Sequence, residues 1–202
     1  MCKGAIILHF RHIISATANL RTSFMRVITG SARGRRLETL RGDDVTRPTA
    51  ENVKEALFSM IQFEIEGKRV LDLFAGSGQL GIEALSRGAE FCAFVENNKN
   101  AAAVVKGNVE RCGFSKSSRL VMGDAISFLT RAEGFDLVLL DPPYGKGFIE
   151  KCMPYLAGAT NDNAIIVCET SKEEQLPENF NGFSVDRERS HGKTKITIYR
   201  KD

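Results

Sequence analysis

The sequence predicts an α/β fold in which helices cover both faces of a mostly parallel sheet. Short apolar segments alternate with helix-length segments across the middle of the chain, which is the pattern of a doubly wound sheet. A glycine-rich segment follows the first apolar segment directly, where such folds turn from strand to helix. The chain has 202 residues, 43% of them hydrophobic, which suffices for one such domain and a small extension.

The strands and helices of the predicted sheet follow one another without long gaps. We expect strands at residues 69–73, 91–95, 119–122, 135–140 and 164–168, and helices near residues 79–87, 98–112, 125–132 and 147–157. Two more strands, at about residues 182–188 and 194–200, are joined by the turn Ser190–Lys193. This terminal hairpin predicts antiparallel strands at one edge of the sheet.

A smaller basic unit is expected ahead of the sheet. Val27–Thr29 and Arg36–Leu40 are short strand candidates around a turn rich in Gly, Ser and Arg, which predicts a hairpin. Arg47-Pro48-Thr49 then opens a helix, because Pro near the first turn is a start signal. Apolar residues follow at the spacing of one buried helix face: Val53, Ala56, Leu57, Met60 and Ile61.

The first 24 residues contain no acidic residue and only a short apolar stretch, which is too interrupted for a secretory signal. We expect a loose tail, or a start codon upstream of a functional start at Met25; a targeting segment is the alternative. The chain is therefore divided into a tail (1–24), a hairpin and helix (25–66) and a main domain (67–202).

Composition narrows the classes of function. No apolar run reaches the roughly 18 residues of a membrane span, so we expect no membrane partner. The five cysteines are widely spaced without a C-x-x-C pair, which favours the reducing cytoplasm over a disulfide framework. The three histidines have no ligand-like partners nearby, so no metal is expected. We also expect a monomer.

Charge is distributed unevenly along the chain. The net charge is +3, yet residues 1–54 hold ten Lys or Arg against four Asp or Glu, and the remainder is slightly acidic. A basic arm on an acidic body suggests a polyanionic partner. A merely solvated arm explains the charge equally well.

The segment DLFAGSGQLGIEALSRGA, residues 72–89, carries the first candidate site. Gly76, Gly78 and Gly81 spell G-x-G-x-x-G between a predicted strand and helix, where glycines allow a tight turn and close approach of backbone N–H groups to a ligand. Glu96 follows the next strand, where its carboxylate could accept hydrogen bonds from both hydroxyls of a ribose. The sequence therefore predicts a ligand that contains adenosine.

Asp72 favours S-adenosylmethionine over NAD as that ligand. A carboxylate beside the glycines can pair with the ammonium of the methionine part, whereas it would repel a pyrophosphate. Asp124, next to Ala125 after the third strand, could accept a hydrogen bond from the adenine amine. Each carboxylate alone is equally explained as a helix cap or a solvated strand end. Three at successive strand ends match the ligand position of open α/β sheets.

The segment DPPYG, residues 141–145, follows the fourth strand at the same edge of the sheet. A target amine needs its lone pair aimed at a methyl donor, and the Asp141 carboxylate and the Pro142 carbonyl can accept its hydrogens. The prolines fix this geometry and remove competing N–H donors. Tyr144 offers a ring for a flat base. A strand that merely stops in a proline turn is the alternative, but it leaves Asp141 and Tyr144 without a purpose.

The glycine loop with Asp72, Glu96, Asp124 and the D-P-P-Y tetrapeptide together resemble class I S-adenosylmethionine-dependent amino-group methyltransferases. The stretches MRVITGSARGRRL, TRPTAENVKEALFSMI, DLFAGSGQLGIEALSRGA and LLDPPYG are similar, more narrowly, to bacterial guanine-N2 methyltransferases of small-subunit (16S) ribosomal RNA. The resemblance runs from about Met25 to the C-terminus. It implies a Rossmann-like, seven-stranded methyltransferase sheet whose N-terminal hairpin and helix assist RNA binding. It also implies methylation of one guanine, in small-subunit ribosomal RNA or on the assembling small subunit.

The same resemblance assigns three sets of residues in this sequence. The cofactor would be held by Asp72, Phe74, Gly76, Gly78, Glu96, Asp124 and Ala125. The unstacked guanine would meet Asp141, Pro142 and Tyr144 as catalytic residues. The RNA would contact Arg33, Arg35, Arg36, Arg47, Thr49 and Pro143, and the alternative role of the arginines is surface solubility.

Two other classes of function remain open. A Rossmann-type dehydrogenase would share the glycine loop and Glu96 but would give the D-P-P-Y segment no role. A non-catalytic RNA-binding protein on the same scaffold would keep the basic arm without needing Asp141. Within the methyltransferases, adenine N6 or a protein glutamine is the alternative target amine.

Overall fold

The structure is a computed structural model that describes residues 24–39 and 47–201. The predicted tail over residues 1–24 therefore lies outside the described residues, except for its last residue. The end of the second predicted hairpin strand, Leu40, also lies outside them.

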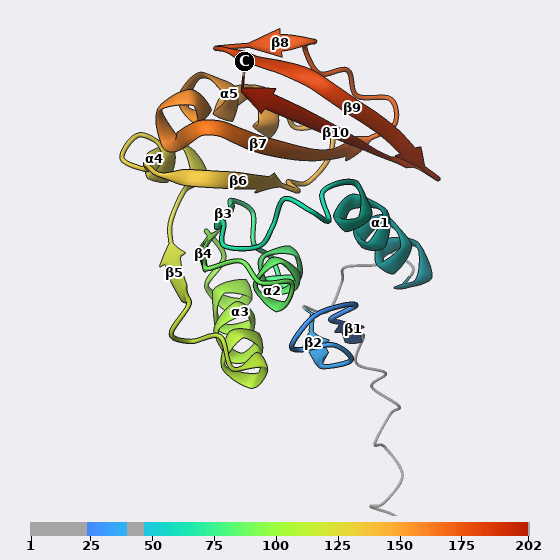
Figure 1. The fold of residues 1–202 in the computed structure, drawn as a ribbon, viewed down its shortest axis with the longest axis vertical. Coiled ribbons are helices and arrows are strands. Elements are labelled where there is room, and N and C mark those ends of the chain that lie inside the picture. The colour runs from blue at the N-terminus through green and yellow to red at the C-terminus, as the bar shows by residue number, and fades with distance from the viewer. Residues whose placement is uncertain (1–23, 40–46, 202) are drawn as a thin grey trace, which may run out of the picture.

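A sheet of eight strands forms the centre of the molecule (Figure 1), in the order β5-β4-β3-β6-β7-β10-β9-β8. Its strands are β3 (Arg69–Asp72), β4 (Phe91–Glu96), β5 (Ser118–Met122), β6 (Phe135–Leu140), β7 (Thr160–Ser171), β8 (Asn179–Phe180), β9 (Phe183–His191) and β10 (Thr194–Lys201). β3 to β7 pair in parallel, and β10 joins β7 and β9 in antiparallel fashion. All seven predicted strands are confirmed, and the two-residue β8 extends the edge beside β9.

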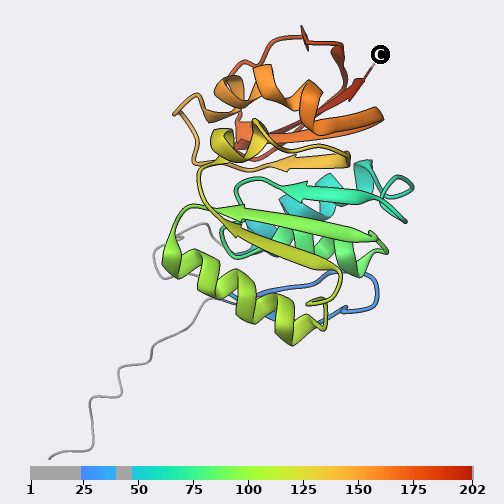
Figure 2. The ribbon, with the colours of Figure 1, turned by 90° about the vertical axis from the view of Figure 1, so that its left-hand side faces the viewer.

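Helices cover both faces of the sheet, as predicted (Figure 2). They are α1 (Arg47–Met60), α2 (Gln79–Ser86), α3 (Lys99–Cys112), α4 (Ala125–Leu129) and α5 (Phe148–Ala159). One hydrophobic cluster joins the sheet to α1, α2 and α3, and a second joins it to α4 and α5. Alternate residues of a strand serve different clusters, because successive side chains point to opposite faces. No helix among the described residues is long and apolar enough to cross a membrane.

One predicted helix is too long. The helix expected over residues 125–132 ends at Leu129. Beyond it, the Arg131 N–H donates to the carbonyl of Phe128 (3.1 Å), and the Ala132 N–H donates to that of Leu129 (3.3 Å). These bonds reach back three residues rather than four, so the chain tightens into turns instead of continuing the α-helix.

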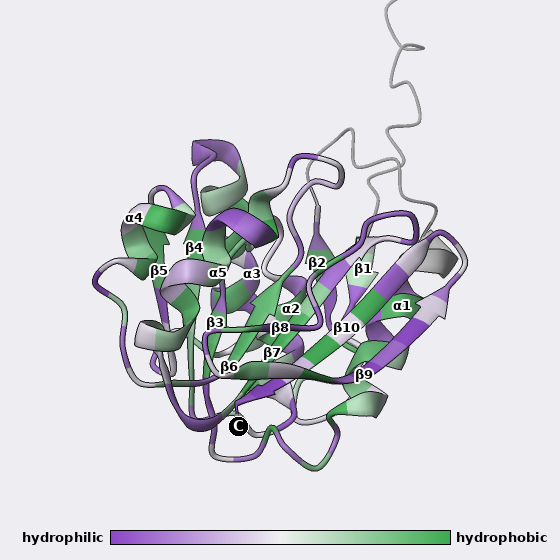
Figure 3. Ribbon diagram, turned by 90° about the horizontal axis from the view of Figure 1, so that it is seen from above, coloured by the Kyte–Doolittle hydropathy of each residue, from purple (hydrophilic) through white to green (hydrophobic). Residues whose placement is uncertain are grey.

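The terminal hairpin differs from the prediction in one respect. Both strands were expected at an edge, but β10 lies inside the sheet between β7 and β9. Ile196, Ile198 and Tyr199 are fully buried, because apolar clusters cover both faces of β10. Figure 3 shows the contrast in hydropathy, with β9 largely hydrophilic and the central strands hydrophobic.

The N-terminal hairpin consists of β1 (Phe24–Arg26) and β2 (Arg36–Glu38). The prediction of its first strand at Val27–Thr29 is wrong by three residues. Beyond Val27 the backbone turns toward α2 instead of pairing with β2, because the N–H groups of Ile28 and Thr29 donate to the carboxylate of Glu83 (2.7 and 3.0 Å).

The hairpin is fastened to the main domain along α2. The Ser31 N–H donates to the Ser86 carbonyl (2.8 Å), and the Ser86 hydroxyl donates to the Thr29 carbonyl (2.5 Å). Lys54 of α1 is buried beneath the hairpin, where its ammonium donates to the Arg26 carbonyl (2.8 Å) and lies 3.9 Å from the Glu83 carboxylate. Hairpin, helix and sheet therefore share one hydrophobic cluster.

Candidate active site

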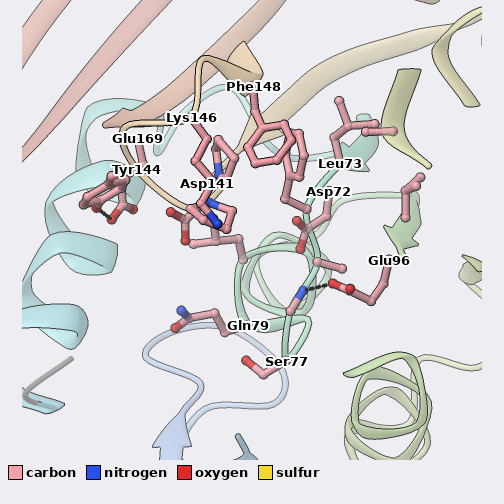
Figure 4. A pocket seen from close by; sticks show the side chains of 18 of the residues that line it. Asp72, Leu73, Ser77, Gln79, Glu96, Asp141, Tyr144, Lys146, Phe148 and Glu169 are labelled. Atoms are coloured by element: carbon pink, nitrogen blue, oxygen red, sulfur yellow. Dashed lines mark hydrogen bonds between the residues drawn. The ribbon is translucent and has the colours of Figure 1, made fainter. Parts of the chain in front are cut away.

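A cavity of about 1460 Å³ opens at the edge of the sheet where the parallel strands end. Its lining includes ten of the residues predicted from the sequence: Asp72, Phe74, Gly76, Glu96, Asp124, Ala125, Asp141, Pro142, Pro143 and Tyr144. They come from the ends of successive parallel strands, so the fold gathers residues that are up to 72 positions apart. Figure 4 shows the carboxylates of Asp72, Glu96 and Asp141 around this space.

The glycine loop is held by the carboxylate of Glu96. One oxygen accepts a hydrogen bond from the Gly76 N–H (2.8 Å; Figure 4), and the other accepts from the Asn98 N–H (2.8 Å). Each carboxylate oxygen has a second lone pair, so Glu96 can still accept hydrogen bonds from a ribose. Gly78 does not line the cavity; it has φ +78°, and a Cβ there would press on Val105 at 3.2 Å.

Asp72 is almost completely buried at the floor of the cavity, with 1% exposure. Its carboxylate accepts a hydrogen bond from the Gly81 N–H in α2 (2.9 Å). The pKa of Asp72 is raised to about 7, chiefly by burial; the hydrogen bond from Gly81 lowers it and the nearby charge of Glu96 raises it, both by less than burial does. A cationic group in the cavity would favour the ionised carboxylate, so the site suits an ammonium ligand.

Asp124 is exposed at the rim and caps α4. Its carboxylate accepts a hydrogen bond from the Ser127 N–H (2.8 Å), and this bond lowers the pKa of Asp124. The helix cap was the alternative interpretation from the sequence, and the structure contains it. Contact with an adenine amine stays a prediction, which the cap does not prevent because a carboxylate has about four acceptor positions on its two oxygens.

Hydrogen bonds attach the D-P-P-Y segment and the glycine after it to residues at the end of β7 and just beyond it. The Tyr144 hydroxyl donates to the Glu169 carboxylate (2.7 Å) and lies 3.3 Å from the Thr194 hydroxyl. The Gly145 N–H donates to the carboxylate of Glu174 (3.0 Å). Burial and the charge of Glu169 raise the pKa of Tyr144, so the phenol stays protonated and remains a donor. The segment is thus a fixed wall of the cavity.

Sequence reasoning missed Glu169, although a signal was available. The strand predicted over residues 164–168 is followed directly by this carboxylate, as other strands are followed by Glu96 and Asp141. The rule that ligands bind beyond strand ends would have selected it as well. Thr194 comes from antiparallel β10, to which that rule does not apply.

The N-terminal unit supplies another wall, through Met25, Thr39, Val53 and Lys54. Burial lowers the pKa of Lys54. The cavity lining also contains Lys146, Lys151 and Lys193, which the sequence analysis did not single out.

The predicted RNA-binding arginines lie elsewhere. Arg33, Arg35 and Arg36 are exposed on the hairpin and do not line the cavity. The Arg35 guanidinium donates to the carbonyl of Arg111 (2.6 Å) in the last turn of α3, a helix that begins next to the cavity and runs away from it. Arg47 and Thr49 belong to the first turn of α1, where side chains are not described.

The sheet order, with its last strand inserted antiparallel, and the carboxylates around the glycine loop define a class I methyltransferase that uses S-adenosylmethionine. A sequence model of the family described as "Conserved hypothetical protein 95" matches residues 25–200. The chain is 35% identical to ribosomal RNA small subunit methyltransferase D of Haemophilus influenzae, over 87% of this chain and 93% of that protein. It is 39% identical to YlbH of Bacillus subtilis, over 88% of this chain and 99% of that protein. The chain belongs to the family of ribosomal RNA small subunit methyltransferase D.

Solved structures agree with this assignment. The structure of yhhF from Escherichia coli is 31% identical, covers 89% of this chain and 99% of its own, and superposes with a TM-score of 0.78. The structure of SMU.776, solved as a complex with SAH, has a TM-score of 0.63 at 16% identity, which shows the likeness of fold alone.

Proposed function

We propose that this chain transfers a methyl group from S-adenosylmethionine to the exocyclic N2 amine of a guanine in small-subunit ribosomal RNA. The observation that carries the proposal is that the D-P-P-Y segment lines the same cavity as the carboxylates around the glycine loop. An amine held by Asp141 and a cofactor held by Asp72 and Glu96 can therefore meet. The names of the relatives from Haemophilus influenzae and Escherichia coli support the RNA substrate.

The cofactor side of the cavity fits S-adenosylmethionine. Glu96 would accept hydrogen bonds from the ribose while it holds the loop through the Gly76 N–H. Asp72 would pair with the ammonium of the cofactor, and Asp124 with Ala125 would contact its adenine. Phe74 lines the same space and forms a tilted ring pair with Phe148 (5.7 Å between centroids). When bound, the cofactor supplies a methyl group attached to a positively charged sulfur.

The residues on the amine side of the cavity would make guanine N2, a poor nucleophile, more reactive. The lone pair of guanine N2 is delocalised into the ring, and acceptors on its two hydrogens favour the pyramidal, attacking form. Asp141 and the carbonyl of Pro142 supply these acceptors in a preorganised position. The nitrogen would become cationic once it has accepted the methyl group, and it would then lose one proton to water while Asp141 and the Pro142 carbonyl hold its hydrogens. Tyr144 would stack on the guanine, which must leave its helix to arrive there.

The RNA backbone would be held outside the cavity. Lys146, Lys151, Lys193 and Pro143 line the cavity. The remaining RNA contacts of the proposal are Arg33, Arg35 and Arg36 of the hairpin, together with Arg47 and Thr49 of α1. In this proposal the enzyme works as a monomer in the cytoplasm, on naked RNA or on the assembling small subunit, without a metal.

Transfer of labelled methyl groups tests the proposal. Small-subunit RNA from a strain that lacks the enzyme would be offered both naked and bound to its proteins, with Asp141→Ala as the matched inactive variant. We expect label in RNA, and N2-methylguanosine as the labelled nucleoside after digestion. Label in N6-methyladenosine or in protein would replace the proposed substrate with one of the alternatives. No transfer to any of these would support a non-catalytic protein.

A further inference from the structure

We propose that Glu169 is the residue that selects guanine, by accepting a hydrogen bond from the ring N1–H while Asp141 accepts one from the N2 amine. This inference rests on the proposed function, because it concerns the base that receives the methyl group.

The register of the sheet places the two carboxylates beside each other. Leu140 of β6 is paired with Cys168 of β7, so Asp141 and Glu169 are the next residues on neighbouring parallel strands. Two positions earlier, Leu139 and Val167 belong to the same hydrophobic cluster. Side chains two apart on a strand point to the same face, so Glu169 of β7 is directed toward the face that α1 covers. Asp141 follows the end of β6 directly, and Figure 4 shows both side chains at the same pocket. Both residues line the cavity.

The hydrogen bonds of Glu169 fix its carboxylate in the cavity wall. Oε1 accepts from the Tyr144 hydroxyl, and Thr194 lies at that hydroxyl's other side. Within the described part of the chain no hydrogen bond reaches Oε2 of Glu169. The Tyr144 ring and the Glu169 carboxylate are thus held together, so that a base stacked on the ring would turn its edge toward the carboxylates.

The edge of guanine matches two neighbouring carboxylates. Its N1–H and its N2 amine are adjacent hydrogen-bond donors. Adenine presents a lone pair at N1 next to its N6 amine, and a carboxylate repels that lone pair. A site built to bond an N–H group discriminates strongly against an analogue that lacks it, because the buried acceptor is left unpaired. Asp141 alone would accept a hydrogen bond from guanine N2 or from adenine N6, so Glu169 is the residue that distinguishes guanine from adenine.

A substrate that differs at N1 tests this directly. Once the methylated position has been mapped, an RNA is made with 2-aminopurine in place of that guanine. This base keeps the amine but has a lone pair at N1. Burial raises the pKa of Glu169, so an alkaline pH favours its ionised form. Initial rates at pH 8 are compared for the two RNAs with wild-type enzyme and with Glu169→Gln. The glutamine keeps an oxygen for the Tyr144 hydroxyl and gains an N–H donor for the altered ring.

We expect wild-type enzyme to prefer guanine over 2-aminopurine by about 100-fold, which is the size of the loss of one hydrogen bond to a charged group. In Glu169→Gln this preference should shrink at least tenfold. The loss of guanine O6 affects both enzymes alike, so it cancels in this comparison. The matched control is Glu173→Gln, which removes one charge from an exposed position at the same cavity and should keep the wild-type preference.

Three outcomes overturn the inference. Wild-type enzyme could use both RNAs equally, a result that needs no variant. Glu169→Gln could bind S-adenosylhomocysteine normally and keep the full preference, or Glu173→Gln could lose as much preference as Glu169→Gln. The proposed function fails separately, when the product from wild-type enzyme is not N2-methylguanosine.

Discussion

Gly30 packs against the carbonyl oxygen of Ser86 so closely that no side chain fits between them. Its φ of +89° also lies in the left-handed region that favours glycine. This contact joins the N-terminal hairpin to the last turn of α2, whose first turn carries the glycine loop of the cavity. This position therefore adds a close backbone contact to the hydrogen bonds that attach the hairpin to α2.

Replacing Gly30 by Ala should detach the hairpin. The change combines an unfavourable φ with a direct clash against backbone, and we expect a loss of at least about 3 kcal/mol in the free energy of unfolding. Gly34 is the matched control, since its φ is +80° but a Cβ there would meet no atom within 4 Å. Gly34→Ala should cost roughly 1 kcal/mol. Urea unfolding measures both, and equal losses would contradict the role of the Ser86 contact.

Glu96→Ala should weaken binding of S-adenosylmethionine and S-adenosylhomocysteine. The carboxylate is expected to accept bonds from the ribose, and it also holds the Gly76 N–H. We expect a loss of roughly 1.5–3 kcal/mol, the range for hydrogen bonds to a charged group. Calorimetry with both ligands measures it, and NAD should show no appreciable affinity. Unchanged affinity in the variant, or clear NAD binding, would contradict the assignment of the cofactor site.

Asp72→Asn should remove one source of pH dependence from the free energy of unfolding. The pKa of Asp72 is raised to about 7, above its ordinary 3.8, so the folded state holds this proton more tightly than the unfolded state. Its contribution to stability is complete below about pH 4 and is lost as the pH rises through 7. Asn stays neutral and can still accept the bond from Gly81. Between pH 4.5 and pH 8, wild type should therefore lose on the order of 3 kcal/mol relative to the variant.

Urea unfolding of both proteins without ligand, at several pH values, tests this expectation. Because all other titrating groups are shared, the difference between the two curves reports on Asp72. Parallel curves would show that the carboxyl does not titrate in this window. Cofactor affinity should rise between pH 6 and pH 8 in wild type only, since the ammonium favours the ionised carboxylate.

Asp141→Ala should lower kcat by roughly 10²–10³, the scale for one preorganised transition-state contact, with cofactor binding intact. Carboxylates are weak bases for an aromatic amine, so we favour an acceptor over a general base. Asn keeps an acceptor oxygen but takes no proton, so Asp141→Asn should retain clearly more activity. Single-turnover methyl transfer distinguishes the roles: equal collapse of both variants indicates a base, and full activity in Asp141→Ala removes the residue from the mechanism.

The sequence predicted the central sheet well because its strands are continuous apolar segments. Phe135–Leu140 is buried on both faces, and its predicted bounds agree with the structure. The first hairpin strand was misplaced because the bonds that bend Ile28 and Thr29 come from Glu83, more than 50 positions away. No local pattern carries that information.

The residues of the candidate site also divide into those that a local sequence pattern reveals and those that only the folded chain brings to the site. Residues that end parallel strands, such as Glu96 and Asp141, could be found from the sequence because the fold brings strand ends together. Lys193 and Thr194 could not, since they reach the cavity only through the insertion of β10 beside β7. The arginines of the hairpin were grouped by charge, a property that does not report direction in space.

Salt dependence separates the two basic groups. Replacing Arg33, Arg35 and Arg36 together by Ala should flatten the log–log salt slope of RNA binding by up to about three, if each contacts a phosphate. The triple variant of Lys146, Lys151 and Lys193 is the counterpart at the cavity. Both should leave binding of S-adenosylhomocysteine almost unchanged. If the salt slope of RNA binding changes only in the lysine variant, the hairpin arginines do not contact phosphates and serve solubility instead.

The position of β10 determines when the two sides of the cavity can form as the chain folds. This strand follows all the others among the described residues and yet lies in the interior of the sheet, where Tyr199 donates a hydrogen bond to the Pro177 carbonyl (2.6 Å). Until it inserts, β7 presents an open, apolar edge of the kind that invites pairing with other chains. During synthesis the cofactor side can take shape earlier than the wall formed by Glu169, Tyr144 and Thr194. The nascent enzyme would thus acquire a place for its methyl donor before it acquires a complete place for its base.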